Sequence, residues 1–222
     1  MRDNNSAFSS DSYDEKIKQT LPYYEEFYEQ VVELIKTFHH HPVSWLDVGC
    51  GTGKMGSTAF KCVDLDQFVF CDSSGEMIKI VQERFNGRNT QFLVCDIQEL
   101  NYVDKFDVVT AIQVIHYLHM DEREAALKKC YQALKKNGLF IVFENFAPFT
   151  DLGTSICLEK WKRYQIKQGK SSEESERHIA RYGKEYFPIS LSENRELLLG
   201  CGFRAVEILW LSNMQVGLWG IK

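Results

Sequence analysis

Five short apolar runs, separated by segments with helical spacing, constrain the fold of this chain more than any other feature. The runs are four to six residues long: Ser44–Val48, Phe68–Cys71, Gln91–Cys95, Phe106–Ala111 and Leu139–Phe143. Such runs suit strands that are buried on both faces of a sheet. Their alternation with helical segments predicts strand–helix–strand units and a parallel sheet.

Helices are expected before and between these strands. From Tyr13 to Phe38 apolar residues recur at three- and four-residue spacing, so an amphipathic helix, broken or kinked at Pro22, should cover the sheet. Ser73-x-x-Glu76 and Asp121-x-x-Glu124 resemble capping boxes that open two further helices. The second of these should end at Asn137-Gly138.

The pattern changes after the fifth strand. Residues Pro148 to Ser190 contain no strand-like run and predict an insertion of two helical segments that meet at Gly169-Lys170, with Ser171 or Ser172 as the second N-cap. A helix over Ser192–Leu199 should follow. Two alternating runs then predict an antiparallel hairpin over Phe203–Leu211 and Met214–Ile221. We expect one domain over residues 1–222, with a mobile tail at 1–12.

Composition excludes several classes of protein. The 222 residues carry a net charge of −5, and no stretch approaches the length of a membrane-spanning helix. The polar N-terminus lacks the apolar core of a signal peptide, so we expect a cytoplasmic protein. Seven cysteines without a C-x-x-C pair predict reduced, mostly buried thiols. The acidic balance argues against direct binding of nucleic acid.

The first strand leads directly into a glycine-rich turn, Asp47-Val48-Gly49-Cys50-Gly51-Thr52-Gly53. Ligands of open α/β sheets bind beyond the carboxyl ends of the strands, where glycines allow positive φ and close approach of the backbone. The G-x-G-x-G spacing and Asp47 favour an amino-acid ligand over a pyrophosphate, because a carboxylate repels phosphate and attracts an ammonium group. The alternative is a tight turn with a structural role alone.

Two more acids follow the next two strands. Asp72 ends the second strand, where it could accept hydrogen bonds from both hydroxyls of a ribose. Asp96 ends the third strand and could accept from an adenine amine, with Ile97 packed on the ring. Either acid alone could merely cap a turn or helix. Three acids on consecutive strands favour a nucleoside linked to an amino acid.

These motifs resemble those of the class I S-adenosylmethionine-dependent methyltransferases. Leu46 to Gly53 looks like the cofactor loop of that family, Phe70 to Asp72 like its ribose site and Cys95 to Ile97 like its adenine site. The resemblance implies an α/β, Rossmann-like fold with a seven-stranded sheet, six strands parallel and one antiparallel, and helices on both faces. The implied cofactor is S-adenosyl-L-methionine. Its candidate binding residues are Tyr24, Asp47, Gly49, Cys50, Gly51, Asp72, Ser73, Asp96 and Ile97.

The flanking segments resemble a narrower group, the carboxy-S-adenosylmethionine synthases, which serve tRNA wobble-uridine modification. Tyr24 would match a tyrosine that lies over the cofactor in that group. Two positions depart from its pattern: Ile112 stands where the group has an asparagine, and Leu197 where it has an arginine that holds the added carboxylate. Arg195 is close in sequence but points to another side of a helix. The chain is therefore expected to lack that carboxylate anchor.

Methyl transfer from a sulfonium requires alignment more than acid–base chemistry, so no catalytic residue is obligatory. His116 and Tyr117, just past the fourth strand, are the candidate catalytic residues, as a general base helps when the acceptor is protonated. The alternatives are a structural histidine and a packing tyrosine. His119 could share a helical face with His116, but without a third ligand no metal site is expected.

The 148–190 insertion is the expected acceptor-selecting lid, together with the helix over 13–38. It mixes aromatic and cationic residues that would suit a small anionic or aromatic acceptor, although solvated helix faces would look the same. These residues are Trp161, Arg163, Tyr164, Arg177, His178, Arg181 and Tyr182. Three functions are open: a methyltransferase for a small-molecule acceptor, for which a homodimer is an allowed state; a carboxy-S-adenosylmethionine synthase; and a non-catalytic cofactor-binding protein.

Overall fold

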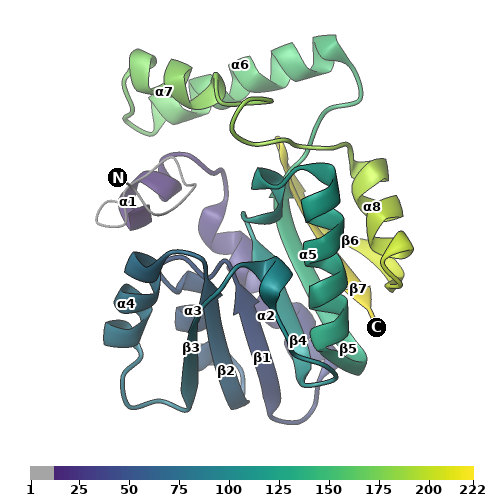
Figure 1. Ribbon diagram of the computed structural model, residues 1–222. Coiled ribbons are helices and arrows are strands. Elements are labelled where there is room, and N and C mark those ends of the chain that lie inside the picture. Colours follow the sequence, from purple (N-terminus) through teal and green to yellow (C-terminus); the bar gives the residue numbers. More distant parts are fainter. Residues whose placement is uncertain (1–12) are drawn as a thin grey trace.

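The computed structural model describes residues 13–222, so the expected tail at 1–12 lies outside the described residues. A seven-stranded sheet forms its centre, in the order β3-β2-β1-β4-β5-β7-β6 (Figure 1). Only β7 runs antiparallel, to both β5 and β6, so six strands share one direction. The expected fold class is confirmed. The strands are β1 (Val43–Val48), β2 (Leu65–Asp72), β3 (Thr90–Val94), β4 (Phe106–Ile112), β5 (Leu134–Asn145), β6 (Arg204–Ser212) and β7 (Gln215–Ile221).

Helices cover both faces of this sheet. On one face α2, α3 and α4 pack on Trp45, Phe70 and Phe143; on the other, α5 and α8 pack on Leu46 and Val109. Because β1 and β4 at the centre of the sheet are buried on both faces, their sequences are mostly apolar. The helices are α1 (Tyr13–Lys18), α2 (Tyr24–Phe38), α3 (Lys54–Cys62), α4 (Gly75–Arg84), α5 (Met120–Ala133), α6 (Asp151–Lys167), α7 (Ser172–Ile179) and α8 (Leu191–Gly200), with short 3₁₀ turns η2 (Ile97–Glu99) and η3 (Ile115–Tyr117).

The helical insertion lies above the carboxyl ends of the strands, with α6 and α7 side by side at the top of Figure 1. Ser171 caps α7, as predicted, and Pro22 lies in the turn between α1 and α2. The indole of Trp161 donates to the Thr20 carbonyl at 2.7 Å, which joins α6 to that turn. We call residues 148–190 the lid.

Three local predictions were wrong. The cap of α4 is Ser74, not Ser73, because the Asp72 carboxylate accepts from the Ser74 N–H at 2.9 Å and delays the helix by one residue. The box that opens α5 lies two residues earlier than expected: the Glu122 carboxylate accepts from the His119 N–H at 3.0 Å. Helix α5 ends at Ala133, before Asn137-Gly138, because β5 begins at Leu134.

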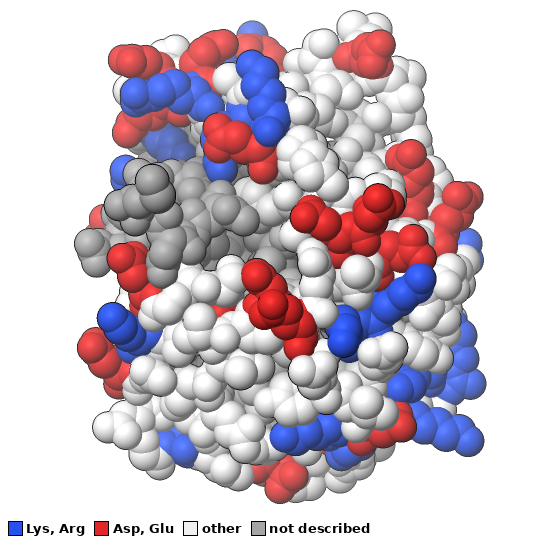
Figure 2. Space-filling view, viewed as in Figure 1, with Lys and Arg blue, Asp and Glu red and all other residues white. Residues whose placement is uncertain are grey.

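Charged side chains of both signs are interspersed over the lid, on the face drawn in Figure 2. In the part of the chain that the structure describes, no helix is long and apolar enough to cross a membrane. Within the same residues, no group of His, Cys, Asp and Glu side chains is arranged to hold a metal ion.

Candidate active site

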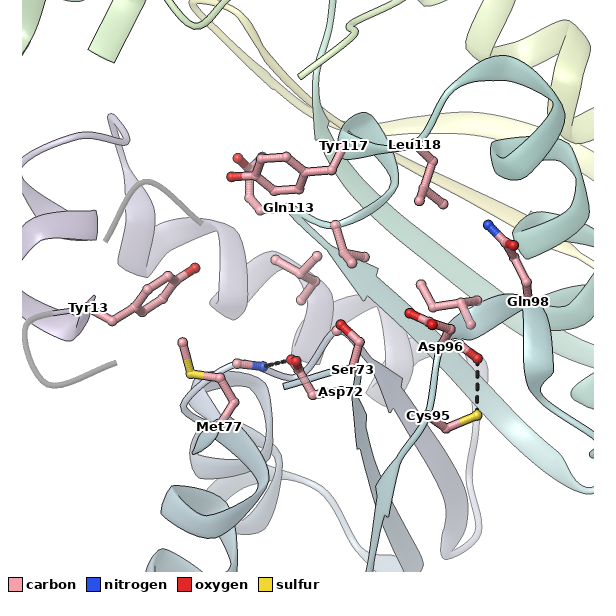
Figure 3. A pocket seen from close by; sticks show the side chains of 15 residues that line it. Tyr13, Asp72, Ser73, Met77, Cys95, Asp96, Gln98, Gln113, Tyr117 and Leu118 are labelled. Atoms are coloured by element: carbon pink, nitrogen blue, oxygen red, sulfur yellow. Dashed lines mark hydrogen bonds between the residues drawn. The ribbon is translucent and has the colours of Figure 1, made fainter. Parts of the chain in front are cut away.

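A cleft of about 130 Å³ lies at the carboxyl ends of β1, β2, β3 and β4 (Figure 3). Its floor is the glycine turn after β1, where Gly49, Gly51 and Gly53 all have positive φ. A Cβ on Gly49 would lie 2.5 Å from a methyl of Val114, so this position requires glycine on steric grounds as well. A Cβ on Gly51 would meet nothing within 4 Å.

Asp72 is fixed at the end of β2 by two main-chain donors. Its Oδ2 accepts from the Gly51 N–H at 2.8 Å and its Oδ1 from the Ser74 N–H at 2.9 Å. Each carboxylate oxygen has two lone pairs, so these bonds orient the group toward the cleft and leave it able to accept from a diol. Ser73, Asp96 and Ile97 line the same cleft, with Asp96 exposed and Ile97 buried.

Asp47 lies beneath this floor and has a different environment. It is buried and accepts from the Thr110 hydroxyl at 2.7 Å; Thr110 in turn accepts from the Trp45 indole at 2.9 Å. Burial, opposed by the hydrogen bond from Thr110 and aided by the negative charge of Asp72, raises the pKa of Asp47 to about 7. A cationic group of a ligand beside Asp47 would favour the charged form of its carboxylate.

Tyr24, Asp47 and Cys50 line a small adjoining cavity that shares Tyr13 and Gly49 with the cleft. Lys54 lies over the Tyr24 ring, 5.9 Å from its centroid, and forms an ion pair with Glu25. The predicted cofactor residues therefore occupy two connected spaces, one lined by acids of β2 and β3 and the other by the buried end of β1.

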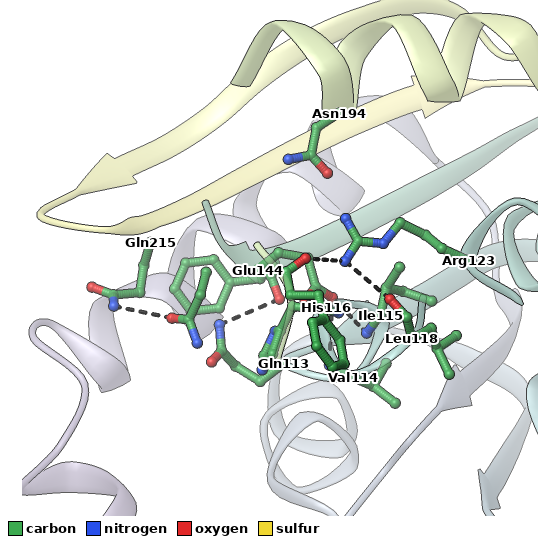
Figure 4. Close-up of polar contacts among 12 residues, drawn as sticks. Gln113, Val114, Ile115, His116, Leu118, Arg123, Glu144, Asn194 and Gln215 are labelled. Carbon is green, nitrogen blue, oxygen red and sulfur yellow. Dashed lines mark hydrogen bonds and ion pairs between the residues drawn. The ribbon is translucent and has the colours of Figure 1, made fainter. Parts of the chain in front are cut away.

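The turn after β4 is held by Glu144 of β5 (Figure 4). This buried carboxylate accepts from the N–H groups of Ile115 at 3.0 Å and His116 at 2.8 Å, and it pairs with Nδ1 of His116. His116 is 2% exposed. Glu144 thus fixes η3 and the adjoining cleft wall.

Two candidate catalytic residues have different positions. Tyr117 lines the cleft, and Arg181 of the lid is a hydrogen-bond partner of its hydroxyl. Burial raises the pKa of Tyr117, so the phenol is neutral at pH 7. His116 is absent from the lining of the cleft and of the cavity above it, contrary to the expectation that it faces the reacting groups. Its pairing with Glu144 favours a positioning role.

Residues 46–138 match a family model described as a methyltransferase domain. This segment therefore carries a methyltransferase domain. The matched segment contains the glycine turn, Asp72, Asp96 and the turn after β4, which form the cleft together with Tyr13.

The similarity to known proteins extends beyond residues 46–138. A curated relative, carboxy-S-adenosyl-L-methionine synthase of Staphylococcus epidermidis, is 20% identical over 218 residues, 98% of this chain and 95% of its own length. Among solved structures, magnesium protoporphyrin IX methyltransferase of Synechocystis with bound S-adenosylhomocysteine has a TM-score of 0.65 at 18% identity, covering 92% of this chain and 86% of that one. The 1,6-didemethyltoxoflavin-N1-methyltransferase of Burkholderia thailandensis has a TM-score of 0.64 at 15% identity, covering 96% and 84%.

Tyr13 and Gln113 are among the lining residues of this cleft that sequence reasoning missed. Tyr13 lines the cleft from α1, a position set only by tertiary packing. Gln113 lines it from a left-handed conformation with φ of 56°, which is uncommon outside glycine and gives no signal in sequence. Its N–H donates to the Phe143 carbonyl at 2.6 Å, so the strained backbone is held by β5.

Proposed function

We propose that this protein transfers a methyl group from S-adenosylmethionine to a small-molecule acceptor bound between the cleft and the lid. The observation that carries the proposal is the continuity of two spaces. The cofactor cleft shares Tyr13, Gln113 and Tyr117 with a second cavity, which the lid closes from above.

The cleft fits the cofactor. The Asp72 carboxylate would hold the ribose hydroxyls, Asp96 the adenine amine and Asp47 the ammonium group; Gly49 leaves room where any side chain would clash. S-Adenosylmethionine supplies a methyl group on a positively charged sulfur: transfer forms a bond to the acceptor atom, breaks the sulfur–carbon bond and leaves its electron pair on sulfur.

The chain's own residues supply alignment and exclusion of water. Tyr13 and Tyr117 place rings at the junction of the two spaces, and the lid covers the acceptor side. Because the Tyr117 phenol is neutral, we assign it hydrogen bonding to the acceptor rather than proton abstraction. His116 and Glu144 act by holding η3.

The test measures binding and turnover separately. Calorimetry should show that S-adenosylmethionine binds the wild-type protein, and acceptor candidates should be screened for formation of S-adenosylhomocysteine. Binding without turnover for any acceptor would favour a cofactor-binding protein without catalysis. Absence of binding would contradict the proposal.

The second candidate is a carboxy-S-adenosylmethionine synthase, favoured by the similarity to the Staphylococcus epidermidis relative over nearly the whole chain. Leu197, where that group has an arginine, packs against the α8 side of the core, and Arg195 lines a surface groove instead of the cleft. We therefore expect no carboxylated product when the protein is given S-adenosylmethionine and prephenate. Detection of that product by mass spectrometry would replace the first proposal with the second.

We also propose a cytoplasmic protein that can form homodimers. Light scattering of the purified chain tests the oligomeric state.

A further inference from the structure

The cavity under the lid has a volume of about 50 Å³ and is built from two distant parts of the chain. Thr20 borders it from the turn after α1, and Trp161, Arg181 and Tyr186 border it from the lid. If the proposed function holds, this is where the acceptor binds, because the cavity opens into the cleft at Tyr117.

Arg181 gives this cavity its charge. Its side chain is 12% exposed, and the described residues that line the cavity include neither Asp nor Glu. The Nε of Arg181 donates to Glu185 at 2.6 Å, but the Glu185 side chain is 60% exposed and faces water. The ion pair therefore anchors the guanidinium from its solvent side, and the Tyr117 hydroxyl anchors it from the cleft side.

A second buried cation adds to the positive potential. Lys170 is 9% exposed, and its Nζ donates to the Thr20 hydroxyl and to Gln165 Oε1, the latter at 3.2 Å. Burial, opposed by the charge of Glu174 and aided by nearby Lys16, lowers the pKa of Lys170 to about 8, so most of the ammonium is charged at pH 7.

Apart from Arg181, the titratable groups that line the cavity are tyrosines and His178, which carry no negative charge; the nearby acids Glu185, Glu174 and Glu144 lie outside the lining. Burial and the cations Lys170 and Arg181 lower the pKa of His178 to about 3, so this residue is neutral. The acidic Glu144, below Tyr117, is engaged by main-chain N–H groups and by His116. A poorly hydrated cavity of this kind attracts an anion more strongly than an exposed arginine does.

We propose that the acceptor is a small carboxylic acid whose carboxylate binds Arg181. The planar guanidinium matches a carboxylate in a bidentate arrangement, and Trp161 and Tyr186 offer apolar walls for the rest of the molecule. The proposal rests on the proposed function, because it assigns the ligand of the same site.

The experiment uses protein saturated with S-adenosylhomocysteine, which occupies the cofactor cleft and leaves the acceptor cavity open. Acetate, benzoate and phenylacetate are titrated, each beside its neutral amide. At least one carboxylate should bind about tenfold or more tightly than its amide, as expected for a charge-assisted pair. Arg181→Ala should abolish this preference.

Arg177→Ala is the matched control. Arg177 lies on the same lid, but its side chain is 69% exposed and pairs with Glu173, so removing it changes the net charge equally without altering the cavity. This variant should keep the wild-type preference. If Arg181→Ala does not fold, Arg181→Gln, which keeps a shorter polar side chain with two N–H donors but no charge, replaces it.

The outcomes separate the two proposals. If S-adenosylhomocysteine does not bind, the proposed function itself is wrong. If it binds and no carboxylate exceeds its amide, or if the Arg181 variant keeps the preference, only the carboxylate assignment is wrong. Formation of a carboxylated sulfonium from prephenate would also overturn it, since the cation would then serve the donor.

Discussion

The cofactor cleft is shaped mainly by main chain, whereas the cavity under the lid is shaped by side chains. In the cleft, Gly49 and Gly51 set the floor by their φ angles, and two N–H groups orient Asp72. In the cavity, Trp161, Arg181 and Tyr186 project from helices and loops into a space that also needs Thr20. The difference explains why one ligand can be inferred from short motifs and the other only from packing.

Gly49→Ala should have the largest effect on stability, because it disturbs the main-chain turn that shapes the cofactor cleft. A new Cβ would meet Val114 at 2.5 Å in a left-handed conformation, for an expected loss of about 2–4 kcal/mol of unfolding free energy. Gly51→Ala is the control: it has positive φ but open space, so about 1 kcal/mol is expected. Urea denaturation measures both, and equal losses would show that the contact with Val114 does not matter.

Asp72→Ala should lower the affinity for S-adenosylhomocysteine about a hundredfold, since it removes two charge-assisted hydrogen bonds to the ribose. Asp64→Ala removes an exposed carboxylate just before β2 and should leave the affinity unchanged. Calorimetry decides the matter. If the Asp72→Ala variant binds S-adenosylhomocysteine as tightly as the wild type does, Asp72 does not hold the ribose hydroxyls.

Asp47 predicts a pH dependence of cofactor binding. With a pKa raised to about 7 it is largely protonated below neutrality, yet an ammonium group favours its charged form. Affinity for S-adenosylhomocysteine should therefore rise with pH, by up to about tenfold per unit below pH 7, and then level off. Asp47→Asn should bind weakly and without this slope.

The stability of the protein without cofactor should depend on pH in the opposite direction to the cofactor affinity. The unfolded chain loses the Asp47 proton near 3.8 and the folded chain near 7, so the folded state binds more protons between these values. The contribution of Asp47 to stability should fall as pH rises from about 4 to about 7. Asp47→Asn should lack this fall, and a wild-type slope in the variant would assign it to another group.

The smallest effect is expected from Trp161→Phe, which tests the side-chain contacts that shape the cavity under the lid. It removes the bond to the Thr20 carbonyl while keeping an aromatic ring, for about 1 kcal/mol. In hydrogen exchange, S-adenosylhomocysteine should protect the lid and the helices over 13–38 in the wild type and less in the variant. Protection confined to the glycine turn would show that these segments are static.

The strands were predictable because Leu46, Phe70 and Val109 belong to runs buried on both faces, a pattern that few other structures produce. Helix α3 was missed because its buried positions are Met55, Gly56 and Ala59, which give little apolar periodicity. The polar start of β5, Lys135-Lys136-Asn137, reads as a helix end, which hid the true length of that strand.

The candidate site divides in the same way. Gly49, Gly51, Asp72, Ser73, Asp96, Ile97 and Tyr117 were expected and do line the cleft. Arg181 was expected only as one of several lid residues, because sequence could not tell it from Arg163 and Arg177, whose side chains are 78% and 69% exposed. Which face of a lid helix turns inward depends on what it meets, and here it meets the turn after α1.

The bond between Trp161 and Thr20 joins residues 141 positions apart, whereas Asp72 and Gly51 are 21 apart. During synthesis, the strands and turns around the cofactor are complete long before α6 emerges. Closing the larger loop also costs more conformational entropy. We therefore expect the part of the nascent chain that forms the cofactor cleft to be able to fold first. The cavity under the lid can form only after the lid has been synthesised and packs on the turn after α1.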